Sequence, residues 1–379
     1  MLNCYIDVRT IARLVIGLSQ KLLSDLSINR LNDSAINFMN FSKFKSKRLG
    51  IDLGTSNCLV WASGEGVVLA EPSVVAVDAV TGKVVAVGSE AHEMLGRTGA
   101  NLVAQKPLKG GVVADYFVAQ AMLTYFLNRV LGRGFSRLLK PEVMVSVPSG
   151  ITQVERRAVL EATIAAGAKS AYLIDQALAA AIGAKLPIES AFGSMVVDIG
   201  AGRVGAAVVS LGGIVASSSA KAGGDRLDEA ISGYLRKHHN LIIGERMAED
   251  VKIKIGSALP FHPKKTMEVK GRDAITGLPK TATVDSSEVT SAIVPIVNSI
   301  VESVKNVLEL TPPELASDII DRGMVLTGGS ANLRGLDRLI ATQTNVPAHV
   351  AEDSQRAVVY GTGMALENLE IWKRLLYTR

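Results

Sequence analysis

The sequence predicts an α/β protein built from two related halves, because one glycine-turned hairpin occurs twice and strands alternate with helices after each copy. The copies are LGIDLGTSNCLVW, residues 49–61, and VVDIGAGRVGAAVVS, residues 196–210. Each has an apolar run, an Asp-x-Gly, a short turn and a second apolar run. Asp52 and Asp198 lie 146 positions apart, as do Gly54 and Gly200. This match indicates an internal duplication.

The second hairpin also carries glycines at the G-x-G-x-x-G spacing of a dinucleotide-binding turn, at Gly200, Gly202 and Gly205. That motif needs a helix to open at the glycines, so that a pyrophosphate meets the helix N-terminus. Here residues 206–210 are small or β-branched and 214–215 resume an extended pattern. Strand, turn and strand is therefore the better interpretation. The chain contains no G-x-x-x-x-G-K-[ST] motif, so a P-loop is not supported.

A pair of such hairpins has a chemical use. Glycine turns expose backbone N–H groups to phosphate oxygens, and an aspartate beside each turn can hold a hydrated divalent cation. Either hairpin alone is also consistent with an ordinary glycine turn. The matched pair favours a phosphate and metal site in the cleft between the halves.

The other elements follow from local periodicity. Expected strands are a hairpin over 73–88 turned at Thr81-Gly82, and strands over 142–147, 171–174, 267–270 and 281–284. Expected helices cover 115–130, a segment opening at Thr152, 177–184, 225–238, 245–255, and 287–308 with an interruption at Pro295. The stretch 322–340 reads as strand, glycine turn and helix, with Asn332 as the N-cap.

Composition narrows the class of protein. The chain has 379 residues, 48% of them apolar, which is enough for a large core and two or more domains. Two cysteines, Cys4 and Cys58, fit neither a disulfide framework nor a metal cluster, and their scarcity agrees with the cytosol. The histidines show no zinc spacing, and His238-His239 reads as a solvated helix end. No uncharged apolar run reaches membrane-spanning length, and no signal-peptide cleavage site stands out.

The positive charge is concentrated in residues 1–48, which hold eight Lys and Arg against three Asp. The rest of the chain is neutral, with 33 residues of each sign, which argues against a nucleic-acid partner. An amphipathic basic arm suits anionic lipid. A packed terminal helix and a true start at Met39 are the alternatives. The apolar positions recur at helical spacing: Val8, Ile11, Val15, Leu18, Leu22 and Leu26.

With both hairpins and LTGGS in place, the sequence is similar to the actin, Hsp70 and sugar-kinase superfamily, and most closely resembles MreB-type bacterial actins. The resemblance runs from about Leu49 to the C-terminus. It rests on IDLGTSN, EPSVVAVD, VPSGITQVERRAV, AAAIGAKLP, AGGDRLDEAI, IGERMAEDVKIKIG, TPPELASDII and LTGG. It implies an actin-like, ribonuclease H-like fold with duplicated domains around a nucleotide cleft. The expected divisions are a basic arm at 1–48, a first half at 49–190 and a second half at 191–379.

The resemblance also implies ATP with Mg²⁺ in that cleft. By matched position, Asp52 and Asp198 face the metal and Glu155 is the catalytic, water-activating carboxylate. The implied nucleotide contacts are Gly54, Thr55, Ser56, Asn57, Gly200, Ala201 and Gly202 at the phosphates, Gly223, Gly224 and Asp225 at the ribose, Glu249 and Lys252 at the adenosine, and Gly328 and Gly329 at the base and phosphates.

Glu155 has a second interpretation. Thr152-x-x-Glu155 is a capping box, in which the glutamate satisfies the N-cap N–H at the start of a helix. Both roles are compatible, since a first-turn glutamate at the cleft can also orient a water toward the terminal phosphate.

The second phosphate hairpin departs from the family pattern. A third glycine, two threonines and an acid are usual there, but in this chain the run is Gly200-Ala201-Gly202-Arg203-Val204-Gly205, with no threonine hydroxyl and an arginine in its place. Arg203 either clamps the terminal phosphate or points away as a surface charge. Further departures are Cys58, Gln153, Asp175-Gln176-Ala177 and Ser330. The sequence thus predicts nucleotide binding and leaves ATP hydrolysis open.

The leading hypothesis is an ATP-binding, filament-forming actin homologue, cytoplasmic and peripheral to the inner membrane, that organises cell-wall synthesis and cell shape. The expected partners are further copies of itself, the membrane surface and the cell-wall synthesis machinery. RGFSRLLKPEV, residues 133–143, matches the apolar loop with which the family enters the bilayer, although an internal turn is equally consistent. An Hsp70-like protein, a non-polymerising nucleotide-binding scaffold and a small-molecule kinase of the same superfamily are the alternatives.

Overall fold

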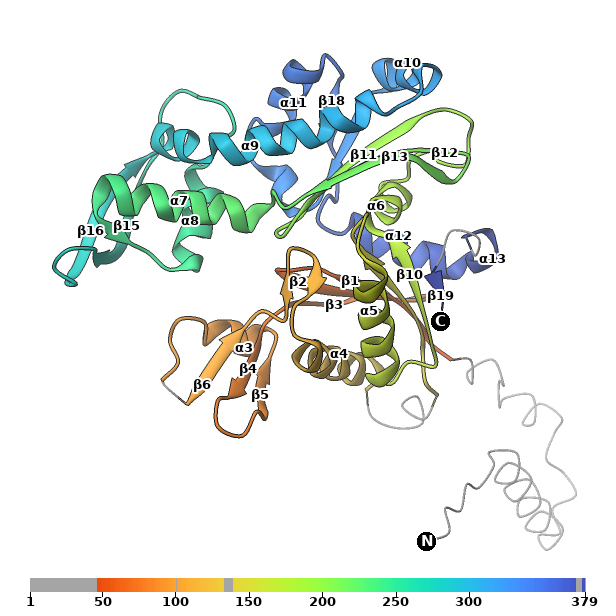
Figure 1. Cartoon of the computed structure of the whole chain (residues 1–379), viewed down its shortest axis with the longest axis horizontal. Helices are drawn as coiled ribbons and strands as arrows, with labels where there is room; N and C mark the ends of the chain where they lie inside the picture. The colour runs from red at the N-terminus through yellow and green to blue at the C-terminus, as the bar shows by residue number, and fades with distance from the viewer. Residues whose placement is uncertain (1–45, 100, 133–138, 373–376, 379) are drawn as a thin grey trace, which may run out of the picture. The chain divides into compact units, whose positions relative to one another are not determined.

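The two central sheets share one plan (Figure 1). The computed structural model describes residues 46–379 except 100, 133–138, 373–376 and 379. The first sheet has the order β19-β10-β9-β1-β2-β3 and the second β13-β12-β11-β17-β18. Strands of the first are β1 (Arg48–Leu53), β2 (Asn57–Ala62), β3 (Gly66–Pro72), β9 (Glu142–Val147), β10 (Ser170–Asp175) and β19 (Tyr377–Thr378); strands of the second are β11 (Ser194–Ile199), β12 (Val204–Ser210), β13 (Gly213–Ala220), β17 (Met324–Thr327) and β18 (Ala348–Val350).

The strand directions confirm the duplication. In each half an antiparallel meander of three strands continues into parallel strands on the other side of its first strand. Leu53 pairs with Cys58 where the first hairpin closes, and Ile199 pairs with Val204 where the second closes. Both hairpins therefore turn directly after their aspartate, at the carboxyl end of a central strand, where open α/β sheets bind ligands.

The helices and the smaller strands surround these sheets. The helices are α3 (Ser89–Glu93), α4 (Tyr116–Leu131), α5 (Gln153–Ala165), α6 (Gln176–Gly183), α7 (Gly224–His239), α8 (Glu245–Ile255), α9 (Ser286–Glu309), α10 (Pro313–Arg322), α11 (Leu336–Thr344), α12 (Ala357–Glu367) and α13 (Leu369–Trp372), with a 3₁₀ turn η3 (Gly329–Asn332). The smaller strands are β4 (Val75–Asp78), β5 (Val84–Val87), β6 (Leu102–Gln105), β7 (Leu108–Lys109), β8 (Val112–Val113), β14 (Leu241–Ile242), β15 (Thr266–Asp273) and β16 (Pro279–Asp285).

Most elements expected from periodicity are present, and two details were wrong. Pro295 does not interrupt α9, which is continuous. The proline is exposed, and burial of Ile293, Val297 and Ile300 on the opposite face stabilises the helix despite one lost hydrogen bond. Asn332 is not an N-cap, because it ends η3 and donates to the Ser354 hydroxyl, while α11 starts after Gly335.

Two helices pack between the sheets at their glycines. On α6 and α12, a Cβ at Gly183 would collide with the carbonyl of Ala357, and one at Gly361 with the carbonyl of Ala179. The glycines thus allow the two backbones to touch. A buried cluster spreads from these helices to β9 and β10 on one side and to β11 and β12 on the other. The division at 190 and 191 stays a prediction, and β19, near the end of the chain, pairs with β10 of the first sheet.

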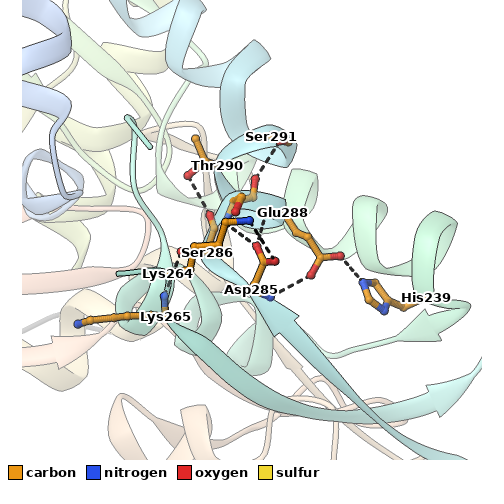
Figure 2. Close-up of polar contacts among 9 residues, drawn as sticks. His239, Lys264, Lys265, Asp285, Ser286, Glu288, Thr290 and Ser291 are labelled. Carbon is orange, nitrogen blue, oxygen red and sulfur yellow. Dashed lines mark hydrogen bonds and ion pairs between the residues drawn. The ribbon is translucent and has the colours of Figure 1, made fainter. Parts of the chain in front are cut away.

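Helix α9 begins with a capping box (Figure 2). Asp285 Oδ1 accepts from the amides of Ser287 and Glu288 at 2.7 and 3.1 Å, and Glu288 Oε2 accepts from the Asp285 amide at 2.9 Å. Glu288 Oε1 lies 2.6 Å from Nε2 of His239, which is half-buried. The pair His238-His239 does end a helix, as expected, but His239 is tied to α9 rather than solvated.

By length and composition α9 is the one described helix that could cross a membrane. It packs against β12 and β13, and one face of it is buried in the core of the second sheet. The basic arm to residue 45 and most of the 133–143 loop, two features expected to meet lipid, lie outside the described residues.

Candidate functional site

A cleft of about 1380 Å³ opens between the two hairpin turns. Residues from both halves of the chain between 46 and 379 line this cleft. Every residue predicted to contact the nucleotide or the metal lies on its wall, except Gly223. Glu155 does not line it either. The predicted residues on its wall are Asp52, Gly54, Thr55, Ser56, Asn57, Asp198, Gly200, Ala201, Gly202, Gly224, Asp225, Glu249, Lys252, Gly328 and Gly329.

The two turns meet at Gly202. A Cβ there would collide with the Thr55 hydroxyl and lie 2.9 Å from Cα of Gly110. The Thr55 hydroxyl in turn accepts from the amide of Gly111 at 2.9 Å. Gly202 is thus required by the close approach of the two halves rather than by its own backbone angles. Gly205, three residues later on β12, has no neighbour within 4 Å of a built Cβ.

In the second turn the carbonyls of Gly200 and Ala201 are occupied, whereas three consecutive amides have no acceptor among the described residues. Gly200 O accepts from the Gly224 amide at 3.0 Å and Ala201 O from the Asp225 amide at 2.8 Å, both at the start of α7. No acceptor in the described part of the chain takes the amide hydrogens of Ala201, Gly202 and Arg203. Consecutive free amides are a typical binding site for phosphate.

Gly223 supports this arrangement from outside the cleft. It is the N-cap of α7, and a Cβ on it would lie 2.7 Å from both the carbonyl carbon of Ala201 and the amide nitrogen of Arg203. It therefore lets the start of α7 pack directly on the second turn.

The aspartate pair is suited to a divalent cation. Asp52 Oδ1 accepts from Ser146 at 3.0 Å, and Asp198 accepts from Thr327 at 2.9 Å and from Gln176 at 2.8 Å. Burial and the neighbouring charge of Asp198 raise the pKa of Asp52 to about 7. Burial raises the pKa of Asp198 to about 6, against the opposing effect of its two hydrogen bonds.

A cation between these carboxylates would relieve both the burial and the repulsion. Among the described residues no group of three or more His, Cys, Asp and Glu side chains could hold a metal. A cation here would therefore keep several water or phosphate ligands, which is the coordination Mg²⁺ prefers. The residues fit the Mg²⁺ that the resemblance implies.

Charged side chains from both halves also contact one another along the wall of the cleft. From the first half, Lys106 Nζ lies 3.6 Å from Asp225 and 3.3 Å from Glu245 on the second. Lys252 Nζ lies 2.8 Å from Asp228, a contact largely shielded from solvent, and burial raises the pKa of Asp228 to about 6. Asp225, predicted to face a ribose, is thus already engaged by Lys106.

Glu155 is held as a helix cap. Its Oε2 accepts from the amide and from the hydroxyl of Thr152, each at 2.8 Å, so the capping box is present. These hydrogen bonds lower its pKa, and the charges of Arg203 and Lys221 lower it further. A lowered pKa makes Glu155 a weak base, although a carboxylate can still orient a water.

Several cleft residues were not predicted as site residues. Gln176, Lys106, Gly110 and Lys221 line the cleft, and Asp228 supports Lys252. The Gly110-Gly111 doublet directly after Lys109 was a readable signal. Gln176 was noticed only as a departure from the family, although it donates directly to Asp198.

The family model for the MreB/Mbl protein matches residues 46–374. The chain belongs to the MreB/Mbl family. It is 48% identical over 325 residues to the cell shape-determining protein Mbl of Bacillus subtilis, covering 86% of this chain and 97% of that one. It is 49% identical over 330 residues to MreB of Escherichia coli K12, with coverage of 86% and 95%.

Solved structures support the predicted actin-like fold of this MreB/Mbl member. MreB5 of Spiroplasma citri bound to AMPPNP superposes with a TM-score of 0.81 at 35% identity, covering 86% of this chain and 97% of that one. The same protein bound to ADP gives a TM-score of 0.81, with coverage of 87% and 99%. A chain of the MamK double helical filament, at 22% identity and a TM-score of 0.72, shares the fold.

Proposed function

We propose that this protein is an ATP-binding actin homologue that assembles into filaments at the inner face of the cytoplasmic membrane and organises cell-wall synthesis and cell shape. One observation carries the nucleotide part of the proposal. Two duplicated glycine turns, each preceded by an aspartate, line one cleft from opposite halves, and the second turn has three consecutive amides without an acceptor among the described residues.

Nucleotide binding is further supported by a relative. MreB5 of Spiroplasma citri has been solved with AMPPNP and with ADP, at 35% identity to this chain. The roles proposed for this chain's own residues follow from position: the amides of Ala201 and Gly202 bind phosphate oxygens, and Asp52 with Asp198 holds Mg²⁺. The bound cation supplies charge neutralisation at the phosphates.

The cell-shape role rests on the names of the relatives, which are cell shape-determining proteins. Large apolar side chains on the surface are the contacts we propose for self-assembly. Ile275 and Leu278, at the turn between β15 and β16, are 78% and 66% exposed, and Leu310 after α9 is 66% exposed. In the proposed filament these side chains are covered by a further copy of the chain; singly exposed apolar groups are otherwise ordinary on a protein surface.

Hydrolysis of ATP is proposed to be slow. The hydroxyls that the family places in the second turn are replaced by Arg203, Val204 and Gly205, and Glu155 is a weak base. In this proposal the nucleotide biases assembly by binding one conformation more tightly, as in any ligand-linked equilibrium.

Sedimentation of the full chain tests the proposal. Wild type is incubated with Mg²⁺ and either ATP, ADP or no nucleotide, and with or without vesicles containing anionic lipid. We expect ATP-dependent pelleting, with greater recovery on vesicles. No pelleting across a broad range of protein concentration would contradict filament formation, and pelleting without any vesicle dependence would contradict the membrane part alone.

A further inference from the structure

Arg203 lies at the contact between the two halves. It is half-buried at the end of the second turn and lines the cleft. Its Nε donates to the carbonyl of Gly110 on the first half at 2.5 Å, and its Nη1 donates to the hydroxyl of Ser219 on β13 at 3.2 Å. Its stem packs beside Gly111. The side chain is therefore held in the cleft and is not a surface charge.

These contacts leave part of the guanidinium unused. The group carries five N–H donors, and only those at Nε and Nη1 have an acceptor within the described ranges. The amide of Arg203 belongs to the same run of free amides as Ala201 and Gly202. A phosphate bound to those amides lies next to the guanidinium of the same turn, and arginine binds phosphate oxygens through two N–H groups at once.

The charge around Arg203 is arranged for a terminal phosphate. Arg203 and Lys221 line the cleft together with Asp52 and Asp198, and Arg203 and Asp198 also share the wall of a small neighbouring cavity. The positive charges of Arg203 and Lys221 lower the pKa of Glu155. A triphosphate spanning this space meets the carboxylates through a cation and the arginine directly. A diphosphate that occupies the same nucleoside position ends one phosphate earlier.

We infer that Arg203 is the residue by which this protein distinguishes a nucleoside triphosphate from a diphosphate, and that it connects the terminal phosphate to the Gly110-Gly111 turn of the opposite half. The inference rests on the proposed nucleotide-binding function and adds the residue that determines its specificity. Because one guanidinium contacts both the turn and the phosphate, loss of the terminal phosphate weakens closure of the cleft at this point.

The test is the ratio of ATP to ADP affinity, measured by calorimetry with Mg²⁺ on the full chain. Wild type is compared with Arg203→Thr and Arg203→Lys. Arg226→Thr is the matched control, because Arg226 also lines the cleft but pairs with Glu229 at its exposed end. We expect Arg203→Thr to weaken ATP about 10-fold or more, with ADP changed by less than about 3-fold, and Arg203→Lys to fall between. Arg226→Thr should leave the ratio unchanged.

Hydrogen exchange provides a readout separate from affinity. The Gly111 amide donates to Thr55 next to the Arg203 contact. In wild type, ATP should slow amide exchange over residues 108–113 more than ADP does. In Arg203→Thr, the two nucleotides should slow this exchange equally. Thermal unfolding confirms that each variant is folded, and Arg203→Lys, which keeps a donor for the Gly110 carbonyl, carries the test if Arg203→Thr does not fold.

The outcomes separate the inference from the function beneath it. An unchanged ATP to ADP ratio in folded Arg203→Thr and Arg203→Lys would overturn the inference while leaving nucleotide binding intact. Wild type that binds neither nucleotide would overturn the proposed function, and the inference with it.

Discussion

The two hairpin turns share a backbone plan and differ in chemistry. Both follow an aspartate near the end of a central strand, half-buried in the first turn and buried in the second, and both line the cleft. The first turn adds the hydroxyls of Thr55 and Ser56, whereas the second adds the guanidinium of Arg203. Buried strand pairing therefore preserves the geometry of a duplicated site, while the turn residues, which are outside the strands, are free to change what that site does with a phosphate.

The largest expected effect comes from filling the contact between the turns. Gly202→Ala places a Cβ against Thr55 and Gly110, so the halves must separate. We expect ATP affinity to fall about 100-fold and stability by about 1–3 kcal/mol. Gly205→Ala is the matched control, since its Cβ has open space, and it should bind ATP as wild type does. Equal losses in the two variants would show that the contact between the turns does not matter.

Replacing an aspartate of the pair should raise the stability of the protein and weaken its binding of ATP. Asp52→Asn keeps an acceptor for Ser146 but removes one of two neighbouring buried charges. Without nucleotide and divalent cation we expect it to be more stable than wild type by about 1–2 kcal/mol at pH 8, and to bind ATP about 10-fold more weakly with Mg²⁺. Chemical denaturation and calorimetry measure the two effects.

The pH dependence of this stability difference follows from the raised pKa. With a folded-state pKa of about 7 and an ordinary value of 3.8, the folded wild type takes up a proton between pH 7 and 4 that the unfolded chain does not. The stability of wild type relative to Asp52→Asn therefore rises as the pH falls through that window. The advantage of the variant should be full above pH 7 and lost near pH 4; an advantage that is constant with pH would contradict the raised pKa.

The smallest expected effects concern the two capping boxes, one in each half. Glu288 uses both carboxylate oxygens, one for its cap and one for His239, whereas Glu155 uses only Oε2 within the described residues. Glu288→Ala should cost about 1–2 kcal/mol and Glu155→Ala about 0.5–1 kcal/mol, measured by denaturation.

Glu155→Gln separates capping from catalysis, because glutamine also serves at this position of a capping box. It should unfold as wild type does. If its phosphate release also equals that of wild type, Glu155 is only a cap; if release disappears while stability is kept, the carboxylate orients the attacking water.

The duplicated fold could be predicted from the sequence because it depends on patterns with a fixed period, whereas most of the individual cleft residues were implied by the resemblance to MreB-type actins. Alternation around Asp52 and Asp198, repeated 146 positions apart, was sufficient to predict two hairpins and a shared site. Residues that reach the cleft from other segments, such as Lys106 and Gln176, could not be assigned, because no local pattern shows which side chain crosses between halves. The Pro295 and Asn332 predictions were wrong because tertiary burial and the η3 turn overrode local propensity.

The central claim is that the two turns together bind one Mg²⁺-linked nucleoside triphosphate. Calorimetric titration of the full wild-type chain with ATP, in Mg²⁺ and again in EDTA, tests it most directly. The account predicts saturable binding of one ATP per chain with Mg²⁺, weakened about 10-fold or more in EDTA. No binding at about 1 mM ATP, or binding of equal strength in EDTA, would contradict it.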